Sequence, residues 1–177
     1  MDLKAESLRL RDLATVPPTA KSRADVVKGL ASKFEGIQAL AAEVFGAWGD
    51  PASKATLKEW FLETMHRPLG WAIRSVGVRE LARVTVAEDA NWVLDLYFGT
   101  DDDLVQHELL RLAAALPSSP AKAMVEEKAH NPDPRIRHSA LKILVWSSWG
   151  NPKDLLRPFA HDSDPVIKKM LRAWRVA

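Results

Sequence analysis

An acidic residue opens a similar phrase three times in this chain, at a constant interval of 31 residues. The three phrases begin at Asp102, Asp133 and Asp164. Each places an aliphatic residue three positions after the acid and another apolar residue seven or eight positions after it, which is the spacing of an amphipathic helix with a fixed start. A period of 20 to 50 residues is typical of stacked supersecondary units, none of which can bury its apolar face alone. The sequence therefore predicts a repeat protein.

Each repeat is predicted to be a pair of helices, with the acidic phrase in the second helix. Asp133 and Asp164 are followed by proline, a favourable helix start because the carboxylate accepts backbone N–H groups while proline has no N–H to leave unpaired. Alanine and leucine dominate the periodic segments, and alternating stretches of strand length are scarce. We therefore expect an all-α fold, an α-solenoid of about five antiparallel helical hairpins. The hairpins expected within a repeat domain of residues 23–177 are 23–48, 50–84, 86–116, 120–149 and 152–177.

Two segments depart from this plan. Residues 1–22 hold one amphipathic stretch before two consecutive prolines, which forbid its continuation, so we expect a capping helix or a mobile tail there. Gly70 and Gly77 lie inside a helix predicted from Pro68 to Val84, where each glycine costs about 1 kcal/mol relative to alanine. They are the predicted weak points of that helix.

The composition excludes several classes of protein. With 177 residues the chain can bury a substantial core without cross-links, and the absence of cysteine excludes disulfides, thiolate metal sites and cysteine nucleophiles. The N-terminal segment is charged every two or three residues, unlike a signal peptide, and no run approaches the roughly 18 apolar residues of a membrane span. We therefore expect a soluble, cytoplasmic protein that makes no membrane contact.

The net charge of +2 hides an uneven distribution. Residues 1–83 carry 13 basic and 10 acidic groups, residues 84–116 carry 1 and 7, and residues 117–177 carry 11 and 6. An acidic belt thus lies between two basic ends. A belt of this kind would repel phosphates if it shared their face, so the pattern is unlike that of uniformly basic nucleic-acid binders.

The phrases NPDPRIRHSALKILVWSSWGNP and HDSDPVIKKMLRAWRV resemble HEAT repeats, particularly the short bacterial type known from phycobilin lyases. The consensus of that type reads Asp-x-Asp-Pro-x-(Val/Ile)-Arg-x-x-Ala-x-x-x-Leu. The positions that match it in the fourth hairpin are Asp133, Pro134, Ile136, Arg137, Ala140 and Leu144. The third hairpin has Gln106 in place of the arginine. This resemblance implies a HEAT or armadillo-like superhelix in which the basic residue reaches the acid of a neighbouring turn.

HEAT arrays are curved stacks whose second helices line a concave face, and that face usually binds another macromolecule. By this resemblance we expect a non-catalytic protein-binding or adaptor module, a scaffold whose basic and acidic helices meet partner surfaces of opposite charge. Self-association of the chain is left open. The expected partner-binding residues are Trp71, Arg74, Asp102, Asp103, His107, Arg137, His138, Lys142, Lys168, Lys169, Arg172, Trp174 and Arg175.

The histidines are the first candidates for an enzymatic centre. His107 and His138 lie one repeat apart, and His107 is followed by Glu108. HEAT-like deoxyhypusine hydroxylases build a di-iron centre from four His-Glu pairs at such positions, whereas this chain has one pair, which cannot saturate a metal. No Gly-rich phosphate loop, His-Glu-x-x-His helix or nucleophile elbow occurs. The sequence predicts no catalytic residue, no metal site and no cofactor.

The chain contains seven tryptophans, and six of them fall into two groups. Three lie at helical spacing with aliphatic residues and are predicted to be core residues. These are Trp60, Trp92 and Trp146. The other three lie beside arginines or near helix ends and are candidates for exposed interface anchors. These are Trp71, Trp149 and Trp174.

A nucleic-acid-binding protein is the alternative. HEAT-like alkylpurine DNA glycosylases use a basic concave groove with tryptophans and an aspartate, and residues 68–77 and 166–175 are similar to their arginine- and tryptophan-bearing helices. Under this resemblance Trp92 and Asp95 would be the aromatic and carboxylate pair. The acidic belt interrupts such a groove, which favours a protein partner. The candidate phosphate contacts are Arg74, Arg79, Arg137, Lys142, Lys168, Lys169, Arg172 and Arg175.

Overall fold

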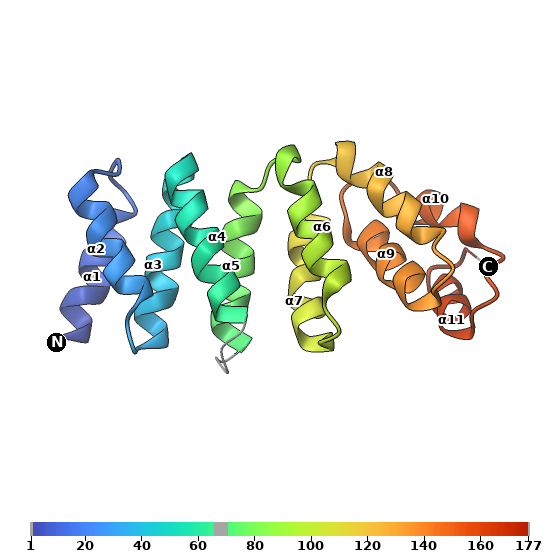
Figure 1. The fold of residues 1–177 in the computed structure, drawn as a ribbon, viewed down its shortest axis with the longest axis horizontal. Coiled ribbons are helices and arrows are strands. Elements are labelled where there is room, and N and C mark those ends of the chain that lie inside the picture. The colour runs from blue at the N-terminus through green and yellow to red at the C-terminus, as the bar shows by residue number, and fades with distance from the viewer. Residues whose placement is uncertain (1, 66–70, 177) are drawn as a thin grey trace. The chain divides into compact units, whose positions relative to one another are not determined.

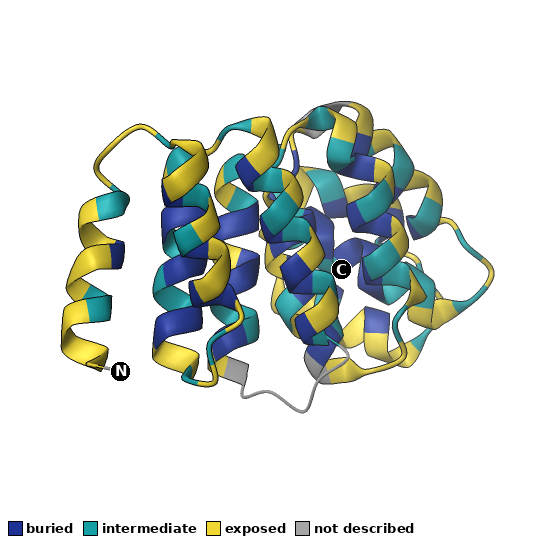
Figure 2. Ribbon diagram, turned by 60° about the vertical axis from the view of Figure 1, so that its left-hand side comes forward, coloured by how far each residue is buried: buried dark blue, intermediate teal, exposed yellow. Residues whose placement is uncertain are grey.

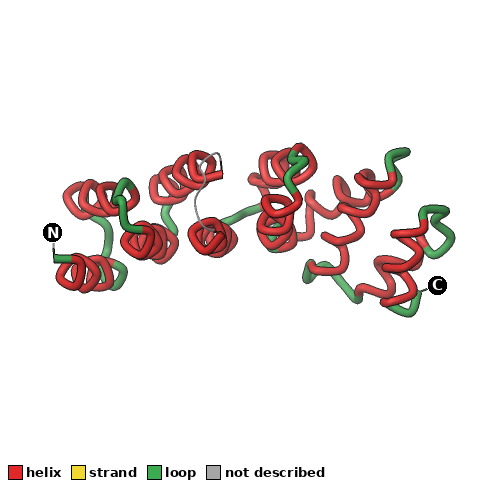
Figure 3. The backbone as a smooth tube through the Cα atoms, turned by 90° about the horizontal axis from the view of Figure 1, so that it is seen from below, coloured by secondary structure: helices red, strands yellow, loops and turns green. Residues whose placement is uncertain are grey.

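A computed structural model describes residues 2–65 and 71–176, and all regular structure in these ranges is helical (Figures 1 and 3). The described residues form eleven α-helices and two short 3-10 helices and contain no strand, which confirms the all-α prediction. None of the described helices is both long and apolar enough to cross a bilayer. The chain divides into two compact units, Met1–Val84 and Thr85–Ala177.

The first unit is built around its third helix. Its helices are α1 (Leu3–Leu13), α2 (Ala20–Leu30), α3 (Glu35–Trp48), α4 (Pro51–Met65) and α5 (Trp71–Val84). Helix α3 packs against the other four, and α2 with α3 and α4 with α5 form two hairpins (Figure 1). Small buried residues such as Ala41, Ala42 and Gly46 let neighbouring helices approach α3 from several sides, and the buried faces of the helices turn toward one another (Figure 2). The predicted start of α5 at Pro68 and the predicted weak point at Gly70 lie outside the described residues.

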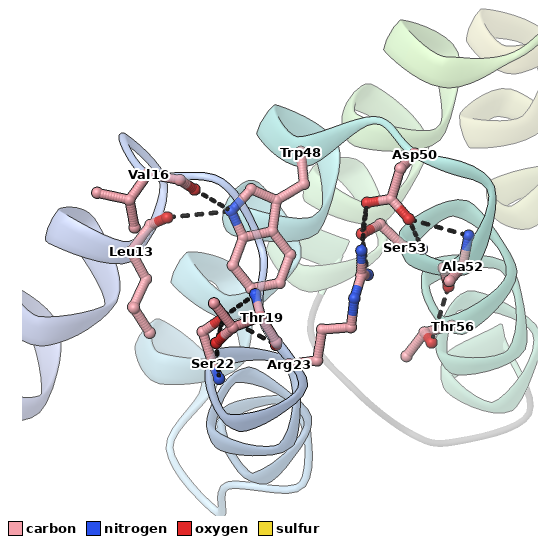
Figure 4. Close-up of polar contacts among 10 residues, drawn as sticks. All are labelled: Leu13, Val16, Thr19, Ser22, Arg23, Trp48, Asp50, Ala52, Ser53 and Thr56. Atoms are coloured by element: carbon pink, nitrogen blue, oxygen red, sulfur yellow. Dashed lines mark hydrogen bonds and ion pairs between the residues drawn. The ribbon is translucent and has the colours of Figure 1, made fainter.

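Helix α1 is joined to the first hairpin through its C-terminal end. It follows an N-cap at Asp2, which accepts hydrogen bonds from the backbone of the first turn. At its other end the indole Nε1 of Trp48 donates to the carbonyl oxygens of Leu13 and Val16, both at 3.0 Å (Figure 4). Leu10 is fully buried. Residues 3–13 thus form a helix that packs on α3.

An arginine joins the first hairpin to the second. The guanidinium of Arg23 on α2 contacts Asp50 Oδ2 at 2.8 Å and donates to Ser53 Oγ at 2.7 Å, and its central carbon lies 5.5 Å from the centre of the Trp48 ring (Figure 4). Asp50 also accepts the backbone N–H groups of Ala52 and Ser53, so it caps α4. Although burial opposes it, hydrogen bonds from Arg23 and Ser53 hold the pKa of Asp50 well below its ordinary value. Asp50 therefore caps the start of α4 and, through its ion pair with Arg23, connects α2 to it.

Gly77 marks a close approach between α4 and α5. A Cβ atom added at Gly77 would lie 2.8 Å from Cδ2 of Phe61 and 3.3 Å from Cζ3 of Trp60. Both aromatic residues are buried, as predicted for Trp60. The sequence-based interpretation of Gly77 as a weak point considered helix propensity alone, whereas the glycine permits the contact of two helices.

The second unit consists of three successive pairs of helices, called hairpins below. The helices of the first two pairs pack against each other, and both helices of the last pair pack on the second helix of the middle pair. Its elements are the 3-10 helix η1 (Ala87–Asp89), α6 (Ala90–Gly99), α7 (Asp103–Ala114), α8 (Ser118–Ala129), α9 (Pro134–Trp146), α10 (Pro152–Leu156), the 3-10 helix η2 (Arg157–Phe159) and α11 (Pro165–Ala173). The second helices follow one another, since α7 contacts α9 and α9 contacts α11, while α6 contacts α8. The core of the unit contains large residues that are fully buried. Among them are Tyr97, Leu109, Leu112, Leu141, Ile143 and Leu144.

Substitution of Gly77 by alanine tests the contact between α4 and α5. We expect Gly77→Ala to lower the free energy of unfolding by about 1–3 kcal/mol, because the added methyl group overlaps Phe61. Gly36→Ala in α3 is the matched control, since a Cβ there meets no atom within 4 Å and helix propensity favours alanine. Urea unfolding of both variants measures the difference. Equal or greater stability of Gly77→Ala would contradict the described packing.

Candidate docking groove between α7 and α9

The three loops before α7, α9 and α11 have the same hydrogen-bond pattern. A side-chain oxygen accepts the backbone N–H of the residue two positions later in each loop. The pairs are Thr100 with Asp102 at 3.3 Å, Asn131 with Asp133 at 2.9 Å, and Asp162 with Asp164 at 2.8 Å. The hydrogen-bond pattern of the loops thus repeats at the same interval of 31 residues as the sequence motif.

The acid at the end of each loop caps the helix that follows. The Oδ1 atom of Asp102 accepts the N–H of Val105, and the same atom of Asp133 accepts the N–H of Arg135. Asp164 accepts two N–H groups at the start of α11, at 2.8 and 3.1 Å. The predicted helix starts are therefore present in all three hairpins, and they fix where the first turn of each second helix lies.

The residues four positions after Asp102 and after Asp133 each connect their hairpin to the next one. Gln106 Oε1 accepts a hydrogen bond from Ser139 Oγ at 3.4 Å. Arg137 Nε and Nη2 contact the two carboxylate oxygens of Asp162 at 2.8 and 3.0 Å, and its Nη1 donates to the carbonyl oxygens of Asn131 and Pro132. The sequence predicts this role for the basic residue of the motif. Because Arg137 is occupied within the protein, we leave it out of the candidate docking surface.

A groove of about 540 Å³ lies between α7 and α9, beside these contacts. Its residues come from the end of α6 and the loop after it, the first turns of α7, and α9 with its N-cap. They are Phe98, Thr100, Asp101, Asp103, Gln106, Asp133, Arg135, Ile136, His138, Ser139 and Lys142. The groove therefore brings together three of the predicted partner-binding residues, Asp103, His138 and Lys142.

The two sides of the groove carry opposite charge. Asp101 and Asp103 lie toward α7, and neither has an ion-pair partner within residues 2–65 and 71–176. Arg135 and Lys142 belong to α9. Arg135 pairs with Asp133 at 3.0 Å, and hydrogen bonds from the side chain and backbone of Arg135 lower the pKa of that carboxyl group. Charged groups of both signs are thus available to an approaching partner.

His138 is the one titratable group of the groove that is half-buried on α9 and changes charge near neutral pH. Burial lowers its pKa, the nearby charge of Lys142 lowers it further, and Asp164 partly opposes both effects. The neutral imidazole is therefore the favoured form at neutral pH, able to donate one hydrogen bond and accept another.

The other predicted site residues lie outside this groove. Asp102, directly before α7, and His107, on α7, are exposed but do not line it. Arg74 is half-buried on α5 of the first unit, and the side chain of Trp71 lies outside the described part of the chain. The remaining predicted residues are exposed on α11 or directly after it. They are Lys168, Lys169, Arg172, Trp174 and Arg175.

Two tryptophans lie near the end of α9, and one of them contradicts its predicted role. Trp149, a candidate interface anchor, donates from Nε1 to the carbonyl oxygen of Leu116 at 2.7 Å and so joins the end of one hairpin to the preceding one. Trp146, predicted to be a core residue, is 64% exposed. It lies eight residues after His138 and four after Lys142, on the outward side of α9, whereas Leu141 and Leu144 face the core. The α9 side of the groove thus continues to an exposed indole.

No cluster of three or more His, Asp or Glu side chains suited to a metal ion occurs in the described ranges. Comparison with models of known protein families gives no match, and a search of curated proteins finds no significantly similar sequence. The resemblance to HEAT repeats therefore stays a prediction that rests on the motif and its spacing.

Removal of the Asp162 charge tests the connection between the last two hairpins. We expect Asp162→Asn to lower the free energy of unfolding by about 2–3 kcal/mol, because the carboxylate, 8% exposed, binds Arg137 with two hydrogen bonds. Asp154→Asn is the control, since its ion pair with Arg157 is exposed and should contribute less than about 1 kcal/mol.

The ion pair of Arg137 with Asp162 also predicts how the free energy of unfolding depends on pH. Hydrogen bonds from Arg137 lower the pKa of Asp162 in the folded protein, so its stabilisation is complete above the unfolded pKa of about 4 and is lost as the pH falls through the lower folded value. The stability difference between wild type and Asp162→Asn should be constant from pH 5 to 8 and shrink below pH 4. Urea unfolding across this range measures it, and a difference that grows on acidification would contradict the assignment.

Proposed function

We propose that the protein is a non-catalytic adaptor, a HEAT-like α-solenoid that binds another protein through its second helices. Three loops with one hydrogen-bond pattern, three helix caps in one register and the contacts of α7 with α9 and of α9 with α11 support this proposal. A stack of this kind presents a continuous row of second helices to a partner.

The groove between α7 and α9 is the proposed docking site, and its opposed charges are the observation that carries the assignment. Asp101 and Asp103 would bind a basic side chain of the partner, and Lys142 with Arg135 would bind an acidic one. A partner with both charges then fits in only one orientation, which gives specificity more than affinity.

Apolar contacts would supply most of the affinity. Phe98 and Ile136 line the groove and are half-buried, and Trp146 lies further along the same side of α9. Exposed tryptophans beside charged residues are the side chains that most often dominate the binding energy of an interface. We therefore place Trp146 in the proposed surface, although the sequence pattern assigned it to the core.

Four cations on α11 or directly after it favour one further candidate, a nucleic-acid partner. Lys168, Lys169, Arg172 and Arg175 are exposed, and none has an ion pair in the described part of the chain. The carboxylates of the neighbouring groove oppose a long polyanion on the same face. The protein partner is therefore the better supported candidate, with α11 meeting an acidic region of it.

Charge reversal in the groove tests the docking proposal. A partner would first be captured from the host lysate with the wild-type protein and purified, and its Kd then measured for each variant. We expect Lys142→Glu and Trp146→Ala each to weaken binding at least about ten-fold, which corresponds to about 1.4 kcal/mol. Lys153→Glu makes the same charge change at an exposed position of α10 and should leave the Kd unchanged. Unchanged binding of both groove variants would refute the site.

A test of oligonucleotide binding distinguishes the nucleic-acid function from the protein-binding function. An adaptor for proteins should show no saturable binding of labelled duplex or single-stranded DNA above about 100 mM salt, since cations without a built phosphate site give only weak, salt-sensitive contacts. Fluorescence anisotropy measures this. Micromolar or tighter binding that falls steeply with salt and disappears in Lys168→Glu/Lys169→Glu would favour the nucleic-acid function instead.

A further inference from the structure

A second groove lies in the first unit. Its lining residues take no part in the hydrogen bonds and ion pairs described above. It has a volume of about 700 Å³ and lies between α1 and the start of α3. From α1 it is lined by Leu3, Ser7 and Arg11, which lie four residues apart and so form one stripe of the helix. From the other side it is lined by residues 33–37, 39 and 40.

The groove combines small side chains with apolar ones. Gly36 leaves open space over α3, because a Cβ atom added there would meet no atom within 4 Å. Leu40 follows Gly36 by four residues on the same side of the helix, and Phe34 lies directly before α3. Opposite them Leu3 is 40% exposed. Small residues between larger apolar ones form the kind of hole into which side chains of another helix can insert.

The charges around this groove are mainly positive. Arg11 and Lys33 line it, and neither has an ion-pair partner in the ranges that the structure describes. Lys33 lies over the ring of Phe34, with Nζ 5.2 Å from the ring centre, so its charge is held at the groove. Glu35 is the one carboxylate among the lining residues. An occupant with carboxylates near Arg11 and Lys33 would therefore be attracted.

We propose that this groove binds an amphipathic helix of a partner protein, with leucine-like side chains inserted between α1 and α3 and a carboxylate directed at Arg11 and Lys33. The volume is within the range of ligand-binding pockets and exceeds that of one side chain, so the occupant presents several apolar groups. Recognition of this kind uses anchors at positions i, i+3 or i+4, and i+7 of the bound helix. The site belongs to the first unit and adds a docking surface that the proposed function does not include.

Selection of helical peptides tests the proposal without knowledge of the partner. A displayed library of amphipathic helices would be selected on the full chain, and the enriched peptides synthesised with a fluorescent label. We expect enriched peptides to carry two or three apolar anchors on one face and Glu or Asp beside them, with Kd values in the micromolar range. Gly36→Trp should abolish their binding because it fills the groove, whereas Gly36→Ala should retain it.

A second set of variants tests the charges and guards against loss of folding. Ser7→Trp blocks the groove from α1, so a folding defect in one tryptophan variant does not decide the result. The double variant Arg11→Glu/Lys33→Glu should weaken the binding of acidic peptides at least about ten-fold. It should bind more tightly those peptides whose Glu is replaced by Lys. Lys142→Glu, in the other unit, should leave peptide binding unchanged, which separates failure of this site from failure of the proposed function.

Several outcomes would overturn the inference. They are the absence of any enriched peptide, peptides that bind Gly36→Trp and Ser7→Trp as well as wild type, and a preference for basic peptides. Saturation of the groove by dodecanoate with no competing peptide would assign it to a small amphiphile. A dimer of the chain, seen by analytical ultracentrifugation and lost in Gly36→Trp, would assign it to a second copy.

Discussion

The last hairpin of the second unit depends on the hydrogen bonds that the carboxylate of Asp162 accepts. It accepts two hydrogen bonds from Arg137 on α9 and the backbone N–H of Asp164, whose own side chain caps α11. One side chain thus holds two hairpins together and sets the start of a helix. Helix α11 has nine residues, too few to be stable alone, and only Ile167 and Leu171 are buried on it. Its exposed cations are therefore presented in a fixed place because Asp162 holds the helix start.

The first unit uses the same chemistry at a different place. Arg23 binds Asp50, and Asp50 caps α4, so here the arginine of one hairpin contacts the very acid that begins a helix of the next. An indole group adds a contact in each unit, since Trp48 donates to the carbonyl oxygen of Leu13 at the end of α1, and Trp149 donates to that of Leu116 just after α7. These polar contacts specify register between hairpins whose buried alanines and leucines would by themselves permit several alignments. The two grooves, one of mixed charge and one mainly apolar, lie beside helices that are held in this way.

Local signals in the sequence predicted much of this arrangement. The Asp-Pro starts of α9 and α11 and the all-α class follow from capping and from the 31-residue interval. The contact of Arg137 with a neighbouring acid was an expectation from the resemblance to HEAT repeats. The burial of Trp146 was predicted wrongly, because it lies at the end of α9, where the pattern does not show which side faces the core. The contact of Arg23 with Asp50 and the groove beside Gly36 could not be predicted, since they depend on how helices distant in the chain approach one another. For the groove between α7 and α9, the sequence predicted three of the lining residues, Asp103, His138 and Lys142, but not the apolar Phe98 and Ile136.

Hydrogen–deuterium exchange of an Asp162→Ala variant tests most directly whether contacts between hairpins fix the binding face. The account predicts that amides of α11 and of the first turn of α9 lose protection, while those of α6 and α7 keep it, because the loss is confined to the connection between the last two hairpins. Unchanged protection of α11, or a uniform loss over the whole second unit, would contradict it.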